Sequence, residues 1–145
     1  MDKEEKSTLL DFMHSQPMAV ISTVSHTSPT PESALIAFAE IETFEIIFET
    51  FHISRKYENL LRDPHVSVVI GWDTTHHVTL QYEGLAYPVP DKEVEGCIRH
   101  FLRKDTPCSE EFLRDVRVRL FRIQPCWLRF SDYTGKPPKI IEHTF

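Results

Sequence analysis

The sequence predicts a mainly β protein of the α+β class, in which antiparallel strands form a closed or half-closed barrel with short helices beside it. Runs rich in β-branched and aromatic residues recur along the chain, about six in number. Most of them pass directly into the next through a short loop, which favours an antiparallel sheet over a βαβ arrangement. Gly84 interrupts an alternating strand, which indicates the bulge or sharp bend at which a sheet curls.

The N-terminal part of the chain predicts one helix and two strands. Apolar residues recur at helical spacing in residues 3–15, and Pro17 ends this helix because a proline cannot donate the next backbone hydrogen bond. Residues 18–25 are rich in β-branched side chains, which is typical of a strand. The loop of residues 26–32 carries two prolines, and a second strand follows at residues 33–40.

The segment of residues 44–61 is the one around which we expect the rest of the chain to be organised. It begins as an apolar strand, turns a polar corner and continues as a helix. Ser54 suits the N-cap of this helix, because its side-chain oxygen can accept from an amide of the first turn. Arg55 and Lys56 then place two positive charges at the positive end of the helix dipole, where each costs roughly 0.3–1 kcal/mol at an exposed site. An Asp-Pro pair at residues 63–64 ends the helix.

An anion bound at this helix start would reverse the sign of that electrostatic energy. It would meet free amides, the Ser54 hydroxyl, a guanidinium and an ammonium, and charge-assisted hydrogen bonds contribute roughly 1.5–3 kcal/mol each. Phosphate groups bind at helix N-termini for this reason. The residues alone leave open the alternative that Arg55 and Lys56 are a solvated pair on a surface helix.

Two strands of different character follow this helix. Residues 65–72 are nearly all apolar, which predicts a central strand buried on both faces. The strand that begins at residue 77 alternates instead, so we expect only one of its faces to be buried. One face carries the apolar side chains of Val78 and Leu80 together with Tyr82. The other face carries the polar side chains of Thr79, Gln81 and Glu83.

The C-terminal part predicts helices and then a long strand. Residues 91–103 form an amphipathic helix with Cys97 on its apolar face, and Ser109 suits the cap of a further helical turn. A long strand at residues 116–123 leads into the segment of residues 124–133. Glycine and proline punctuate the remaining tail, which we therefore expect to be irregular apart from a short docked segment.

The composition fits an ordinary globular chain, and we expect one domain over residues 1–145. Apolar residues make up 41% and charged residues 26% of the sequence. There are 16 Lys and Arg residues against 22 Asp and Glu residues, which gives a net charge of −6 without a basic stripe. This balance argues against nucleic-acid binding and against an anionic membrane surface as a partner.

Targeting and metal-binding patterns are not apparent. No apolar run approaches the length of a membrane span, and the charged N-terminus does not resemble a signal peptide. The three cysteines are widely spaced, which fits reduced thiols in a cytoplasmic protein, and Cys108 is the one we expect to be most exposed. The eight histidines form no zinc-binding spacing, so we do not expect a metal site.

Three stretches in order resemble one known family. They are FETFHISRKYENLLRDPHVSVVIGW at residues 48–72, LQYEGLAYPV at residues 80–89 and PCWLRFSDY at residues 125–133. Together they resemble the FMN-binding split-barrel proteins, the pyridoxamine 5′-phosphate oxidase-like family, and the resemblance extends over about residues 15–133. It implies a six-stranded antiparallel Greek-key split β-barrel that forms a homodimer, with FMN in clefts between the two subunits.

The resemblance also assigns cofactor-binding roles by position. The FMN phosphate would be held by Thr50, Ser54, Arg55 and Lys56. Thr79 or Gln81 would offer a polar side chain near the flavin ring, and Trp127 and Arg129 match the late aromatic and basic positions near the cofactor. Read without the resemblance, Gln81 fits a solvated side chain better than a cofactor contact, and Trp72 and Trp127 are more often core or dimer-interface aromatics than flavin contacts.

Two departures from the family pattern bear on activity. Typical oxidases carry an arginine and a lysine on the strand that matches residues 33–40, and this strand has no basic residue. The C-terminal Arg-x-His segment that binds their substrate is also absent. From the resemblance we expect an FMN-dependent oxidoreductase that acts on a small molecule. Because of these two departures, we do not expect an authentic pyridoxamine 5′-phosphate oxidase. The alternatives are a non-catalytic FMN or heme carrier or sensor, and a cofactor-free structural dimer.

Overall fold

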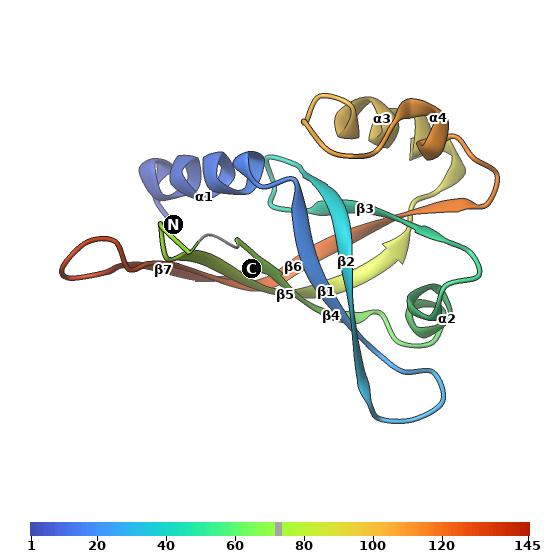
Figure 1. Ribbon diagram of the computed structural model, residues 1–145, viewed down its shortest axis with the longest axis horizontal. Helices are drawn as coiled ribbons and strands as arrows, with labels where there is room; N and C mark the ends of the chain where they lie inside the picture. Colours follow the sequence, from blue (N-terminus) through green and yellow to red (C-terminus); the bar gives the residue numbers. More distant parts are fainter. Residues whose placement is uncertain (72–73) are drawn as a thin grey trace.

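Seven strands form one antiparallel sheet that closes on itself within residues 1–71 and 74–145, the part of the chain that the computed structural model describes (Figure 1). The strands are β1 (Met18–Val24), β2 (Pro31–Glu40), β3 (Ile46–Phe51), β4 (His65–Ile70), β5 (Val78–Pro88), β6 (Val118–Asp132) and β7 (Lys139–Thr144). The helices are α1 (Lys3–Ser15), α2 (Arg55–Arg62), α3 (Asp91–Phe101) and α4 (Glu110–Leu113).

The strand order is that of a Greek-key barrel. It runs β3-β2-β1-β4-β5-β6-β7, and β3 also pairs with β6, so six strands close and β7 extends the sheet beyond the closure. β1, β2 and β3 follow one another as a meander, and β4 returns to pair with β1, which is the Greek-key connection. The predicted six-stranded antiparallel split barrel with short flanking helices is confirmed.

The barrel interior is filled by the inward side chains of all six closing strands. Phe48 and Phe121 stack with ring centroids 5.5 Å apart, and Tyr82, buried to 1% exposure, donates its hydroxyl to the carbonyl of Phe44 at 3.0 Å. In Figure 1, α1 and α2 stand at opposite ends of the barrel. Phe12 of α1 packs on Phe130 at 5.3 Å, so the helix closes its end of the core with aromatic contact.

A second apolar cluster lies outside the barrel, where α3 and α4 cover one side of the sheet. Its members are Ala37, Ala39, Ile47, Val89, Cys97, Ile98, Phe101, Leu113 and Leu120. Cys97 is buried there, as the helical pattern predicts. The helix ends at Phe101, two residues before its predicted end, and Leu102 is exposed because it follows the last turn.

The structure differs from the sequence prediction at β4 and at the C-terminal tail. β4 is buried on one face only, since Val66, Val68 and Ile70 point inward while its alternate side chains stay exposed. The second apolar cluster covers β2, β3 and β6, and it leaves the outer face of β4 to solvent. The tail, predicted to be irregular apart from a short docked segment, forms a regular strand, β7, which pairs with β6 from Lys139 to Thr144. Trp72 lies outside the described residues.

Gly84 and Phe44 lie at two irregular points of the sheet. Gly84 lies at a register shift between β5 and β6, which confirms the predicted bulge. A Cβ atom at this position would lie 2.4 Å from the carbonyl oxygen of Gln124, so only glycine allows the two backbones to approach so closely. Phe44, predicted to belong to a strand, lies in the turn before β3 with φ 66°, and β3 begins at Ile46.

Candidate functional site

The start of α2 is tied to the end of β3 by two hydroxyl groups. Ser54 is the N-cap, as predicted, and its Oγ accepts from the backbone amide of Tyr57 at 3.3 Å. The same oxygen lies 2.7 Å from Oγ1 of Thr50, which is buried. The helix start therefore has a fixed position on the barrel, and the side chains that follow Ser54 project from a rigid base.

A cavity of about 200 Å³ opens in front of this helix start. Its lining joins β1, β2 and α2 and consists of Thr23, Glu32, Ser33, Ala34, Ser54, Arg55 and Lys56. Three hydroxyls and two cations thus converge with one carboxylate at the positive end of a helix. The structure brings together three of the four residues predicted to hold a phosphate, and the fourth, Thr50, contacts Ser54 directly.

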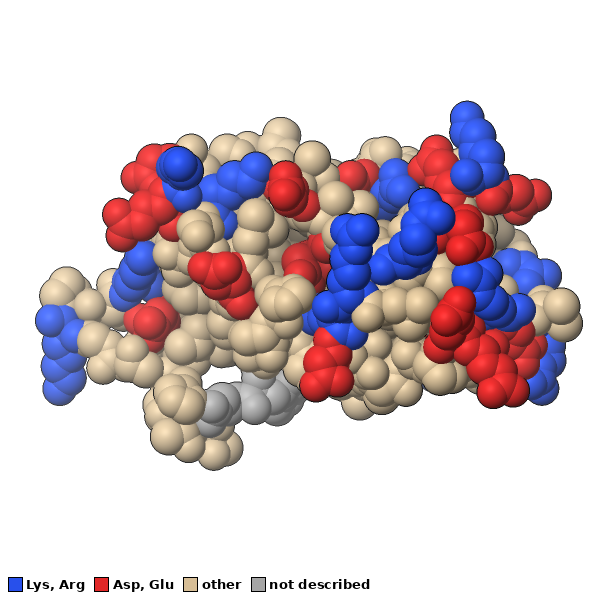
Figure 2. Space-filling model, turned by 90° about the horizontal axis from the view of Figure 1, so that it is seen from above, with Lys and Arg blue, Asp and Glu red and all other residues tan. Residues whose placement is uncertain are grey.

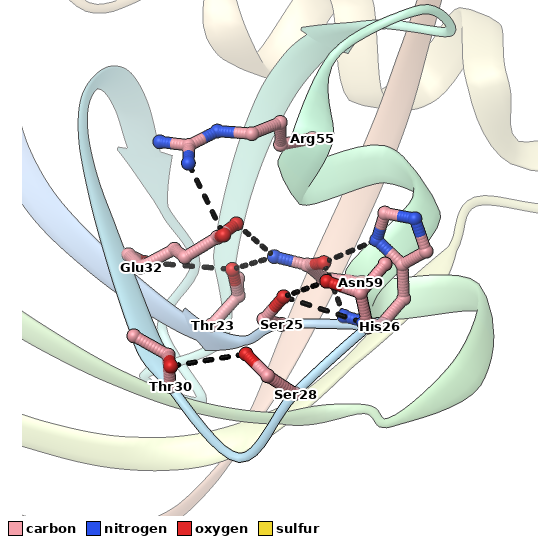
Figure 3. Close-up of polar contacts among 9 residues, drawn as sticks. Thr23, Ser25, His26, Ser28, Thr30, Glu32, Arg55 and Asn59 are labelled. Atoms are coloured by element: carbon pink, nitrogen blue, oxygen red, sulfur yellow. Dashed lines mark hydrogen bonds and ion pairs between the residues drawn. The ribbon is translucent and has the colours of Figure 1, made fainter.

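The predicted phosphate-binding arginine has a carboxylate partner inside the protein. Nη1 of Arg55 lies 3.1 Å from Oε1 of Glu32 on β2, with side-chain exposures of 73% and 19% (Figure 3). The other carboxylate oxygen accepts from Nδ2 of Asn59 at 2.9 Å. The Asn59 hydrogen bond, followed by the charges of Arg55 and His26, lowers the pKa of Glu32 below its ordinary value.

Asn59 connects this cluster to the loop between β1 and β2. It is fully buried, and its Nδ2 also donates to Oγ1 of Thr23 at 2.9 Å. Its Oδ1 accepts from the backbone amide of His26 at 2.8 Å (Figure 3). Neither Asn59 nor Glu32 was predicted from the sequence as part of the site. Asparagine has a low helix propensity, so its presence inside a short helix could have indicated a specific role for Asn59. Nothing in the residues next to Glu32 indicates its role.

Lys56 also faces an acidic residue. It and Glu49 of β3 are both half-buried, and burial lowers the pKa of Lys56 while the charge of Glu49 opposes the shift. Burial raises the pKa of Glu49, against the opposing charge of Lys56. The side chain of Glu49 also lies 3.9 Å from Sγ of Cys108. Glu49 is therefore a partly buried acidic neighbour of the site.

The cysteine prediction is corrected by the same contact. Cys108 is only partly exposed, and burial, followed by the negative charge of Glu49, raises the pKa of its thiol to about 11. Cys126 on β6 is the exposed cysteine. This raised pKa favours the protonated thiol of Cys108 at neutral pH, whereas the thiolate is the nucleophilic form.

The other four predicted cofactor residues lie on the outer face of β5 and β6. Gln81 is the cross-strand partner of Arg129, and Thr79 is the partner of Ser131. Trp127 donates its Nε1 hydrogen to Oε1 of Glu142 at 3.1 Å, and Nη1 of Arg129 lies 3.6 Å from the other oxygen of that carboxylate. Because Glu142 belongs to β7, the strand that the sequence did not predict holds both of the late site residues.

These two groups form separate surfaces on one chain. The cavity at α2 is lined by β1 and β2, whereas Gln81 lies on β5, three strand pairings from β2. Neighbouring strands lie roughly 4.8 Å apart, so the separation along the sheet is roughly 14 Å. A row of outward side chains crosses the sheet between them through the register partners Leu35, Val20, Val69, Gln81, Arg129 and Glu142.

A second charged cluster lies where α1 meets the α3 side of the barrel. The side chain of Lys104 is 3% exposed, and its Nζ donates to Glu40 at 2.6 Å and to the carbonyl of Met13 at 2.8 Å. The ammonium also stands 3.5 Å from the ring centroid of Phe38. Burial lowers the pKa of Lys104 to about 8 against the opposing contacts with Glu40. We interpret this cation as a cap on the Met13 carbonyl in the last turn of α1.

Charge on the molecular surface is mixed. On the face shown in Figure 2, basic and acidic side chains are interspersed, without a continuous basic stripe. Within residues 1–71 and 74–145, no three or more His, Cys, Asp and Glu side chains are arranged to hold a metal ion. In the same part of the chain, no helix has both the length and the apolar character needed to cross a membrane.

Comparison with known families identifies the group to which this barrel belongs. The sequence pattern described as pyridoxamine 5′-phosphate oxidase matches residues 6–130, which is most of the chain. The chain belongs to the pyridoxamine 5′-phosphate oxidase family. The family suggested by the three sequence stretches is thereby confirmed. A search of curated protein sequences finds no match.

Solved structures show the same fold at low sequence identity. A heme binding protein from Mycobacterium smegmatis superimposes with a TM-score of 0.79 at 11% identity, covering 99% of this chain and 58% of that protein. A putative pyridoxamine 5′-phosphate oxidase from Listeria innocua gives 0.71 at 21% identity, covering 87% and 97%. HutZ, a heme storage protein from Vibrio cholerae, gives 0.69 at 20% identity, covering 82% and 88%.

Proposed function

We propose that this protein is a flavoprotein that binds FMN at the start of α2 and acts as an oxidoreductase on a small molecule. The observation that carries the proposal is the cavity of about 200 Å³ in which Ser54, Arg55 and Lys56 meet at the positive end of a helix. Family membership supports a flavin as the ligand that brings the phosphate.

The side chains present fit a phosphate monoester. The backbone amides of Arg55 and Lys56 open α2, where the first N–H groups of a helix lack an i−4 acceptor and point toward its N-terminal end. The next amide, that of Tyr57, is already bonded to Ser54. Hydroxyls of Thr23, Ser33 and Ser54 line the same cavity as the two cations. This donor set matches three phosphate oxygens and their negative charge.

The roles of the chain's own residues follow from their positions. Bound FMN would supply the redox chemistry, and the protein would supply orientation and electrostatics. Arg55 and Lys56 would hold the phosphate charge, while Ser54 and Thr50 fix the helix start that carries them. Gln81 would offer an amide toward the ring from the outer face of β5. We assign no catalytic residue.

We also propose a homodimer, because one chain carries the two groups of predicted cofactor residues on separate surfaces. A second copy packed against the outer face of β2, β1, β4 and β5 would bring its own Gln81, Trp127 and Arg129 toward the α2 cavity of the first. Leu35 and Val69, which are 62% and 38% exposed on this face, are apolar side chains that such packing would cover. Sedimentation velocity of the flavin-loaded protein should give the mass of two chains. A monomer that retains FMN tightly would contradict this arrangement.

Heme is the second candidate ligand, because two of the structures with this fold are described as a heme binding and a heme storage protein. The absorption spectrum of the purified protein separates the candidates. Bound FMN gives the two flavin bands, bound heme gives a Soret band, and a cofactor-free dimer gives neither. Titration of the colourless protein with FMN and with heme, each followed by spectroscopy and by thermal stability, then tests both ligands directly. Saturable FMN binding supports the proposal, and binding of heme alone overturns it.

A further inference from the structure

Both cations of the proposed phosphate site have an acidic residue near them. Glu32 of β2 contacts Arg55 at 3.1 Å and lines the cavity itself. The carboxylate of Glu49 on β3 acts on Lys56, and its negative charge raises the pKa of that lysine against the effect of burial. The positive charge that the sequence places at the helix start is therefore balanced within the protein. An incoming dianionic phosphate meets a site whose local charge is close to neutral.

Glu32 is held in place from both sides. Asn59, which has no exposed surface, donates to Oε2 of Glu32 at 2.9 Å, and Arg55 contacts Oε1 (Figure 3). Asn59 is in turn fixed by Thr23 and by the backbone amide of His26. The carboxylate of Glu32 is 19% exposed and cannot swing away without breaking this network. A fixed negative charge therefore remains beside the cavity when a ligand enters.

We propose that Glu32 determines which phosphate ligands this site accepts. It pairs with Arg55 in the free protein, so a phosphate must compete with it for the guanidinium and must tolerate its charge. Free inorganic phosphate would meet the donors of the cavity but makes no contacts outside it to offset this competition, so the site should bind it poorly. A phosphate monoester attached to a large planar group has further contacts and can bind. This inference deepens the proposed function and rests on it.

The Glu32→Gln variant tests the proposal because it removes the charge and keeps the shape. The glutamine oxygen can still accept from Asn59, so the network to Thr23 and His26 is preserved. FMN affinity, measured for the parent and variant chains by flavin fluorescence, should rise roughly twofold to fivefold, the range of a partly exposed charge interaction. Inorganic phosphate should become a measurable competitor of FMN. Riboflavin affinity should not change, because riboflavin has no phosphate.

A matched control separates this local effect from a general change of charge. Glu58 lies on the same helix and is exposed, so Glu58→Gln removes one negative charge without changing the carboxylate that faces Arg55. It should leave FMN affinity nearly unchanged. Glu32→Asp keeps the charge but withdraws it by one methylene from Arg55, so it should give a smaller gain than Glu32→Gln.

A third variant shows whether Glu32 acts through Arg55. In an Arg55→Ala background, the gain from Glu32→Gln should shrink, because the competition for the guanidinium is gone. Folding of each variant is checked by circular dichroism. Unchanged or weaker FMN affinity in folded Glu32→Gln would overturn the proposal for Glu32 and leave the FMN assignment standing. Absence of FMN binding in every folded variant, including the parent protein, would overturn both.

Discussion

The hydroxyl oxygens of Thr50 and Ser54 lie 2.7 Å apart and join the last inward position of β3 to the N-cap of α2. Thr50 is buried against the barrel, so the contact fixes where the helix begins. Since Arg55 and Lys56 follow directly, their backbone amides and side chains start from a rigid position. Rigid placement lowers the entropy that is lost when these groups bind a ligand.

Replacing Arg55 and Lys56 together by alanine should abolish retention of FMN. Each cation would form charge-assisted hydrogen bonds with the phosphate that contribute roughly 1.5–3 kcal/mol, so losing two weakens binding by at least about a hundredfold. The measurement is FMN and riboflavin titration of parent and variant. The parent should prefer FMN, and the variant should bind the two equally weakly.

Lys3→Ala with Lys6→Ala is a suitable control for that double variant. Both lysines are exposed on α1, and their removal changes the net charge by the same amount. The control should bind FMN like the parent. Undiminished FMN affinity in a folded Arg55→Ala, Lys56→Ala protein would remove these residues from the phosphate site.

The buried Lys104 should make stability depend on alkaline pH. Its folded-state pKa is lowered to about 8 from an ordinary value of 10.5. Between these values the unfolded chain binds the proton and the folded protein does not, so stability rises with pH in this window. The free energy of unfolding of the parent minus that of Lys104→Met should therefore increase between pH 8 and 10.5. The span should be about 1–3 kcal/mol.

The difference between the two proteins is the quantity to measure, because other groups titrate in both. Burial raises the pKa of Tyr82 above its ordinary value, and Tyr82 is present in parent and variant alike. Urea unfolding at closely spaced pH values gives the difference directly. A difference that stays flat or falls across the window would show that Lys104 keeps its proton.

Gly84→Ala should destabilise the barrel. The added Cβ would lie 2.4 Å from the carbonyl oxygen of Gln124 and 2.7 Å from a methyl of Ile123, so β5 and β6 must move apart. Overpacking of this kind costs roughly 1–3 kcal/mol, which urea unfolding measures. Gly96→Ala on α3 is the control, since its Cβ would contact nothing within 4 Å. It should stabilise the protein by up to about 1 kcal/mol through helix propensity.

FMN-loaded protein should not oxidise pyridoxamine 5′-phosphate efficiently. That reaction requires a second phosphate-binding cluster, and β2 brings a carboxylate to the cavity, Glu32, where basic side chains are expected of an oxidase. Arg129, another cation available to a substrate, faces Glu142. Loss of two charge-assisted bonds corresponds to at least about a hundredfold in kcat/KM. Efficient turnover with oxygen in a steady-state assay would refute this expectation.

Reduction of the bound flavin by a nicotinamide donor would fit a general reductase.

Local patterns were sufficient for most of the barrel. The alternation from Val78 to Glu83 fixes which face of β5 is buried, because side chains of a strand point alternately to its two sides. The bulge at Gly84 and the cap at Ser54 were also predicted. A glycine inside a strand allows a close approach of two backbones, and a serine before a helix accepts a hydrogen bond from an amide of the first turn. β7 was missed because its residues follow glycine and prolines and gain their hydrogen bonds only from β6.

The sequence by itself determined the family, the strand-rich barrel and the cationic helix start, because each depends on residues close together in the chain. Only the tertiary structure decided what surrounds that helix start. Glu32 lies 23 positions before Arg55, and the pairing of β1 with β2 brings it to the same cavity. Electrostatic energy depends on distance in space, so the net charge of this site could not be read from the order of its residues.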